Sequence, residues 1–156
     1  MRKTSPHLLA SALLLAVGLG LGACQSMNNN DMAMAKPAAP TLYQRLGGKA
    51  AISVVVDDFV ANVAADPVIN KRFAHTDIPK LKMNLVDQLC QASGGPCVYH
   101  GKDMVTAHKG MHITVTEFNA MGGDMAKALD QAKVPDREKH EVLALLGSME
   151  KDVVGH

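Results

Sequence analysis

The segment from Ser93 to Phe118 places one histidine, His108, among apolar residues, and reads Ser-Gly-Gly-Pro-Cys-Val-Tyr-His-Gly-Lys-Asp-Met-Val-Thr-Ala-His-Lys-Gly-Met-His-Ile-Thr-Val-Thr-Glu-Phe. Met104 lies four residues before His108 and Met111 three residues after it, so on a helix the three side chains share one face. Gly110 is suited to end this helix. The sequence therefore predicts a short helix that carries a single imidazole on an apolar face.

A lone imidazole on an apolar helix face has three interpretations. It can be a core histidine bonded to a backbone carbonyl group. It can bind a metal together with His112, four residues later, if the helix continues through Gly110. It can also be the single axial ligand that a haem iron needs on its proximal side. No Cys, Asp or Glu obviously completes a metal site with the two histidines, and the residues around His108 alone do not decide further.

The rest of the chain favours an all-α fold. Tryptophan is absent and methionine is abundant, with ten residues, so the core is built from Val, Leu, Ala and Met. Apolar residues recur at helical spacing, although the run Val54–Val56 alone is also compatible with a strand. Thr114 with Glu117 has capping-box spacing. We expect two long helix pairs, antiparallel, with the His108 segment between them. Thr41 is suited to cap a short first helix, Asp77 the third helix, and Thr114 the helix whose inward face runs from Phe118 to Ala132. The second helix carries Ile52 to Val63 on its inward face and ends near Asp66-Pro67, and the last helix starts at Pro135 and reaches Val153.

The N-terminus predicts secretion. Arg2 and Lys3 precede the apolar run Leu8–Leu21, which is shorter than the roughly 20 residues that a bilayer span needs. The run ends in Leu-Gly-Ala-Cys, which resembles the lipobox of bacterial lipoproteins, where the signal is cut before a cysteine that then carries lipid. We therefore expect a signal peptide over 1–23 and a lipidated Cys24, with an ordinary signal peptide or an uncleaved anchor as the alternatives.

The residues after Cys24 refine the expected location. Gln25 stands where many lipoproteins carry an Asp that retains them at the inner membrane, so we expect the periplasmic face of the outer membrane. Residues 24–40 lack apolar periodicity and read as a flexible tether. Its methionines can bind Cu(I), although drift in a linker explains them equally well: Met27, Met32 and Met34. In an oxidising periplasm Cys90 and Cys97 can form a disulfide, or both can stay reduced.

Three segments of the remaining chain resemble the group 1 truncated haemoglobins. Residues 42–48 (Leu-Tyr-Gln-Arg-Leu-Gly-Gly) resemble the first glycine motif of the family, and Gly94-Gly95 matches the second. Residues 107–111 (Ala-His-Lys-Gly-Met), with Ile113 and Phe118, match the segment around the proximal histidine. The three motifs occur in order and at the family spacing, so 41–154 is identified as a truncated globin domain by resemblance.

The resemblance implies a two-over-two helical sandwich around haem. His108 would then be the proximal iron ligand, Phe73 the residue stacked on the porphyrin, and Lys80 a cation for a haem propionate. Further haem-binding residues on the family pattern are Leu81, Leu85, Tyr99, Met104, Met111, Phe118 and Leu146, with Met149 beside them. No Cys-x-x-Cys-His motif is present, which favours haem b held without covalent bonds.

The distal side departs from the family pattern. Many members have a Tyr where this chain has Val60, and a Gln where it has Leu85; Leu81 is apolar too. The polar candidates that remain on this side are Asn84, Gln88 and His75. A hydrogen bond to bound O₂ contributes on the order of 1–3 kcal/mol, so the substitutions predict a distal pocket that retains O₂ weakly.

The favoured function is reversible binding of a diatomic gas, O₂, NO or CO, at the cell envelope, by a binder or carrier and not an enzyme. The alternative is an NO dioxygenase or peroxidase-like haem enzyme, which needs a separate reductase because no flavin or nicotinamide motif is present. A haem-free lipoprotein that handles metals through His and Met is a third class. The formal charge of +1 is not strongly basic, so nucleic acid is not an expected partner.

Overall fold

The structure is a computed structural model that describes residues 38–156. The expected signal peptide (1–23), Cys24, the tether methionines and most of the tether lie outside these residues. Within them the chain forms these helices: α1 Leu42–Arg45, α2 Gly48–Ala65, the 3-10 helix η1 Asn70–Phe73, α3 Ile78–Ala92, α4 Met104–His108, α5 Val115–Gln131, α6 Asp136–Gly147 and α7 Glu150–Val153. Over the same residues, no helix is long and apolar enough to cross a membrane.

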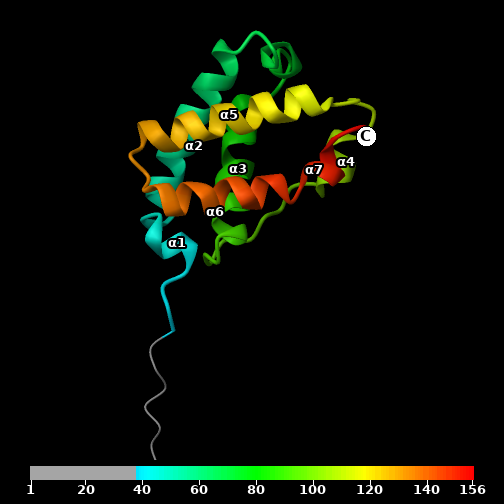
Figure 1. Ribbon diagram of the computed structural model, residues 1–156. Helices are drawn as coiled ribbons and strands as arrows, with labels where there is room; N and C mark the ends of the chain where they lie inside the picture. The colour runs from blue at the N-terminus through cyan, green and yellow to red at the C-terminus, as the bar shows by residue number, and fades with distance from the viewer. Residues whose placement is uncertain (1–37) are drawn as a thin grey trace, which may run out of the picture. The chain divides into compact units, whose positions relative to one another are not determined.

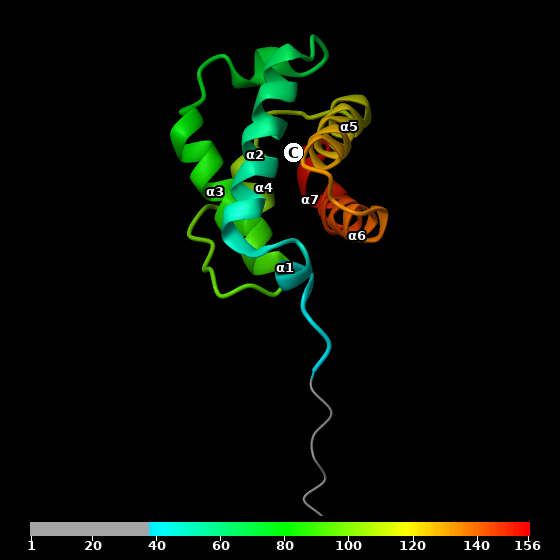
Figure 2. The same cartoon turned by 90° about the vertical axis from the view of Figure 1, so that its left-hand side faces the viewer.

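The four long helices form two layers. α2 and α3 run antiparallel in one layer, and α5 and α6 run antiparallel in the other, crossing the first pair (Figures 1 and 2). α2 packs on both α3 and α5 and so joins the layers. This arrangement confirms the all-α fold and the expected two helix pairs, with the short α4 at one end of the pairs.

The helix starts follow the capping residues that the sequence shows. Thr41 and Gln44 form a reciprocal capping box at α1, in which the Gln44 backbone N–H donates to the Thr41 hydroxyl at 3.2 Å and the Thr41 N–H donates to the Gln44 side-chain oxygen at 2.9 Å. The Asp77 carboxylate accepts from the Lys80 backbone N–H at 3.1 Å and caps α3. Thr114 and Glu117 form a second capping box, at α5. Local sequence therefore fixes where three of the helices begin.

The larger of two apolar clusters forms the core between the two layers. Its fully buried side chains include Val56 of α2, Cys90 of α3, and Met125 and Leu129 of α5. Burying a side chain of this size contributes about 1.5–3 kcal/mol. Val56 faces this core, whereas Val54 is 52% exposed on the other side. Two residues that are two positions apart would share a face in a strand, so these exposures fit the helix that the valine run forms.

The last helix differs from the single one that the sequence predicts. α6 ends at Gly147, and a separate short helix, α7, starts at Glu150. The Ser148 hydroxyl donates to the Leu145 carbonyl at 2.7 Å, and the Met149 N–H donates to the Leu146 carbonyl, one residue closer than in an α-helix. Glycine followed by a back-bonded serine weakens the helical ladder, which accounts for the break.

Candidate functional site

A cavity of about 570 Å³ lies between the helix pairs and α4. Its size falls within the range of roughly 300–1,000 Å³ that is typical of sites for small molecules and cofactors. Every predicted haem-binding residue lines it, and most of the lining is apolar. The predicted residues that meet here are Phe73, Lys80, Leu81, Leu85, Tyr99, Met104, His108, Met111, Phe118, Leu146 and Met149, with Asn84 and Gln88 of the distal set.

His108 is the last residue of α4 and faces this cavity. Asp103 caps the helix by accepting from the Thr106 N–H at 2.9 Å. The His108 Nδ1 lies 2.8 Å from the Met104 carbonyl oxygen. A carbonyl oxygen only accepts, so Nδ1 donates in this bond, and in a neutral imidazole Nε2 then keeps its lone pair. This is the arrangement that a metal-ligating histidine adopts, with one ring nitrogen bonded to the protein and the other available for the metal.

The sequence predicted Met111 on the same helix as His108, and this is wrong. The helix ends at His108 and the chain then turns sharply. Lys109 has φ −55° and ψ 125°, and Gly110 has φ +78°, a conformation that favours glycine. The Met111 N–H donates to the His108 carbonyl at 3.0 Å and closes this turn. The turn returns Met111 to the cavity wall. His112 is exposed and lies outside the cavity lining, so the two histidines do not form the metal pair considered above. Within residues 38–156, no three His, Cys, Asp or Glu side chains are grouped to hold a metal ion.

Residues from the end of the chain support the His108 segment. α7 packs on α4, and Ile113 forms an isolated parallel bridge with Val154. The Gly155 N–H donates to the Ile113 carbonyl at 2.9 Å. Ile113, Phe118 and Val153 form a second apolar cluster, against which Met104 and Met111 pack. The segment that carries His108 is thus fixed by α5 and α7 together.

The distal wall comes mainly from α3. Leu81 and Leu85, one turn apart, line the cavity together with Asn84 and Gln88. The Gln88 amide donates to two thioether sulfurs, those of Met104 at 3.4 Å and Met149 at 3.6 Å. Sulfur is a weak acceptor, so this amide has no strong partner among these contacts.

Two residues of the expected distal set lie outside the lining. Val60 is 9% exposed and belongs to the core cluster, while its neighbour Phe59 lines the cavity. Consecutive residues on a helix point in different directions, so Phe59 and Val60 do not both face the cavity. His75 is exposed and does not line the cavity.

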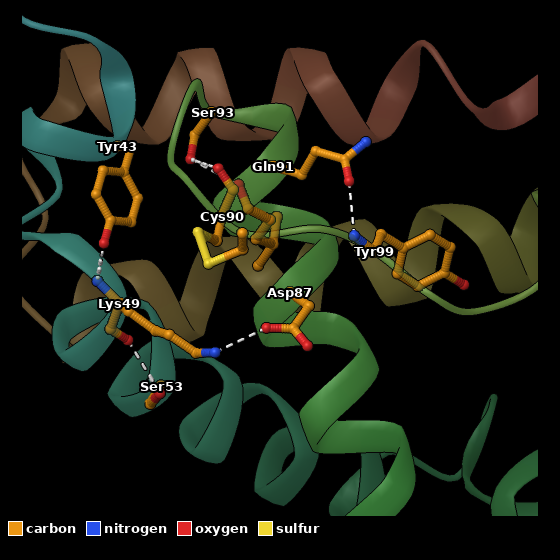
Figure 3. The surroundings of a disulfide bond; sticks show 10 residues. Tyr43, Lys49, Ser53, Asp87, Cys90, Gln91, Ser93 and Tyr99 are labelled. Atoms are coloured by element: carbon orange, nitrogen blue, oxygen red, sulfur yellow. Dashed lines mark hydrogen bonds and ion pairs between the residues drawn. A yellow bond between two sulfur atoms is a disulfide. The ribbon is translucent and has the colours of Figure 1, made fainter.

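A disulfide holds the loop that leads from α3 to α4. Cys90 and Cys97 are bonded, with their Cα atoms 5.7 Å apart, which answers the alternative that the sequence left open (Figure 3). The Gln91 side-chain oxygen accepts from the Tyr99 N–H at 2.6 Å, and the Tyr99 hydroxyl donates to the Lys102 carbonyl at 2.9 Å. Burial, with the nearby Asp103 carboxylate, raises the pKa of Tyr99 above its ordinary value. The loop residues 99–102 therefore form a fixed edge of the cavity.

Sequence reasoning missed several lining residues. Arg72 and Glu117 face each other at the cavity edge: the guanidinium donates to both carboxylate oxygens, at 2.7 and 3.1 Å. This bond is the main cause that lowers the pKa of Glu117 to about 2. Glu117 has a visible local role as a capping residue, and nothing in the neighbouring sequence indicates its second partner. Other lining residues that the site prediction did not include are Phe59, Ile69, Thr76, His100, Lys102 and Met121.

The residues present fit a haem. A mostly apolar cavity suits the porphyrin, and His108 offers one unprotonated ring nitrogen as an axial ligand. Lys80 and Lys102 line the cavity as well, and an ammonium group can pair with a propionate carboxylate.

Comparisons with known proteins show the family of this chain. The family model described as Bacterial-like globin matches residues 41–154. The group 1 truncated haemoglobin GlbN of Mycolicibacterium paratuberculosis is 34% identical over 119 residues, covering 76% of this chain and 86% of that protein. The solved structure of truncated haemoglobin from Tetrahymena pyriformis, in the Fe(III) form, superposes with a TM-score of 0.73 at 32% identity, covering 75% of this chain and all of that one. The chain therefore belongs to the bacterial-like globins and, within them, to the group 1 truncated haemoglobins.

Proposed function

We propose that this protein holds haem b in the cavity, with His108 as the proximal ligand, and that it reversibly binds a diatomic gas on the opposite side. The observation that carries this proposal is the hydrogen bond from His108 Nδ1 to the Met104 carbonyl, which leaves Nε2 available inside a mostly apolar cavity of about 570 Å³. Haem supplies an iron with a further coordination position that takes O₂, NO or CO.

The chain's own residues would position the haem and set the ligand preference. Phe73, Met104 and Phe118 provide apolar surface on the cavity wall, and Lys80 provides a cation for a propionate. Leu81 and Leu85 on the α3 side donate no hydrogen bonds, which favours a non-polar ligand such as CO over O₂. The expected properties are haem retention with weak retention of O₂.

Two single substitutions test the assignment of the iron ligand. His108→Ala should abolish or strongly reduce the Soret band of purified protein reconstituted with haem. His112→Ala is the matched control, because His112 is an imidazole four residues away, exposed and outside the cavity lining. It should keep the spectrum of the wild type. A wild-type Soret band in both variants would show that the iron ligand is another residue.

A second candidate function is NO dioxygenation or a peroxidase-like activity. Asn84 and Gln88 favour it, because their side-chain amides line the α3 side of the cavity and are able to donate a hydrogen bond to a polar ligand. Either activity needs electrons from a separate reductase. O₂ consumption that depends on NO, measured with an added reductant, distinguishes this candidate from simple gas binding.

We further propose that the protein is anchored by lipid on Cys24 at the periplasmic face of the outer membrane. The lipobox-like sequence supports this, and so does the Cys90–Cys97 disulfide, because disulfides persist mainly in oxidising compartments such as the periplasm. Cys24→Ser should release the protein from the membrane fraction or block its processing. Unchanged fractionation together with an unchanged mass would argue against the anchor.

A further inference from the structure

Arg72 joins two walls of the cavity that lie far apart in the sequence. It belongs to η1, directly before Phe73, and η1 packs on α2. Its Nε and Nη2 donate to the two carboxylate oxygens of Glu117, at 2.7 and 3.1 Å. Its Nη1 donates to the Met111 carbonyl at 2.9 Å. One guanidinium therefore bonds both to the turn after His108 and to the first turn of α5.

The partners of Arg72 are themselves fixed in place. The Glu117 Oε2 also accepts from the Thr114 N–H and hydroxyl group, both at 2.9 Å, so the carboxylate is held by its own capping box. The Glu117 side chain is only 16% exposed, whereas that of Arg72 is 35% exposed. Two parallel bonds between a guanidinium and a carboxylate fix direction as well as distance, which a lysine does not do.

We propose that Arg72 is a positioning residue for haem retention: it ties the Phe73 wall to the His108 turn and so keeps the cavity closed around its contents. The inference rests on the proposed function, because it assumes that haem occupies the cavity. Arg72, Glu117 and Met111 all line this cavity, so loss of the tie opens it at that edge. The expected consequence is faster dissociation of haem, with little change in the absorption spectrum of the bound haem, since His108 is untouched.

Transfer of ferric haem to an excess of apomyoglobin, followed at the Soret band, tests the inference. Arg72→Gln should release haem roughly threefold to tenfold faster than the wild type, the range expected when a charge-assisted and partly exposed set of bonds is lost. Glu117→Gln keeps the shape and the capping oxygen but removes the charge, and should also release haem faster. Arg72→Lys should lie between the wild type and Arg72→Gln, because a lysine retains the charge without the two-point contact.

Lys82→Gln is the matched control. The Lys82 side chain is also 35% exposed, and it pairs with Asp57 at 2.8 Å, outside the cavity lining. Haem release from this variant should match the wild type, and the thermal midpoints of both apoproteins are measured beside it, so that a loss of stability is distinguished from a loss of positioning.

Two outcomes would overturn the inference, and they are distinguishable. Equal haem release from Arg72→Gln and Lys82→Gln would show that Arg72 contributes no more than an ordinary surface ion pair. If Arg72→Gln does not fold, the same comparison is made between Glu117→Gln and Lys82→Gln. Absence of a Soret band from the wild-type protein would overturn the proposed function itself, and the inference with it.

Discussion

Reduction of the Cys90–Cys97 disulfide should cost the protein a measurable part of its stability. The bond joins residues separated by 7 in the sequence, within a loop that continues to the cavity edge at Tyr99. In the chain-entropy model, closing a loop of this length lowers the entropy of the unfolded chain enough to stabilise the fold by about 2.4 kcal/mol. We expect the free energy of unfolding to fall by up to this amount on reduction.

Urea unfolding of the apoprotein, followed by far-UV circular dichroism with and without a phosphine reductant, measures the loss. The apoprotein is used because a bound cofactor complicates a two-state treatment. With a slope of about 1.5 kcal/mol per molar urea, a loss of about 2.4 kcal/mol lowers the midpoint by roughly 1.6 M.

Cys97→Ala is the matched control for the reductant. Cys97 is partly exposed, whereas Cys90 is fully buried, so truncating Cys90 would add the cost of a cavity. The variant should unfold at the midpoint of the reduced wild type and should not respond to the reductant. Coincident midpoints for oxidised and reduced wild type would refute the reasoning, because the loop would then be held equally well by its hydrogen bonds.

Three further changes probe the cavity and its supports. Leu85→Gln places a hydrogen-bond donor on the cavity wall and should slow O₂ release, which stopped-flow measurements follow. The rate should fall by about tenfold for each 1.4 kcal/mol of hydrogen bond gained. Faster release from Asn84→Ala would instead show that Asn84 already donates to the ligand. Gly95→Ala should destabilise the fold, measured as a lower thermal midpoint, because the added Cβ would lie 2.5 Å from Tyr43 Cδ2. The pKa of Glu117 is lowered to about 2 in the fold, from an ordinary value of 4.5. The contribution of the ionised carboxylate to the free energy of unfolding is therefore complete above about pH 4.5 and is lost as the pH falls towards 2. The thermal midpoint of Glu117→Gln should depend less on pH in this range than that of the wild type.

Local chemistry in the sequence predicted the helix starts and the histidine. Thr41, Asp77 and Thr114 cap helices as their spacing indicates, because capping involves residues only three positions apart. His108 lines the cavity. It could be singled out in advance because its motif and its apolar neighbours are both visible in the sequence.

The features that the sequence did not predict depend on packing between distant segments. Arg72 bonds to Glu117 across 45 residues, and no local pattern indicates that pairing. Val60 matches a family position by alignment, but the direction of its side chain is set by how α2 packs on its neighbours. The break between α6 and α7 is local instead: it follows Gly147 and a bond from the Ser148 hydroxyl back to the Leu145 carbonyl, and a serine that follows a glycine in the sequence does not show whether its hydroxyl makes this bond.

The support of α4 by the end of the chain has a consequence for the order of folding. A helix of five residues is far too short to persist alone in water, where roughly 12–15 residues are needed. α4 therefore becomes stable only after α5 and α6 have docked and have brought α7 and Val154 back to Ile113. Contacts between distant segments form late, because the intervening loop must close first. We therefore expect His108 to be among the last residues to reach its native position, and in the apoprotein the amides of α4 should exchange with solvent faster than those of α2 and α5.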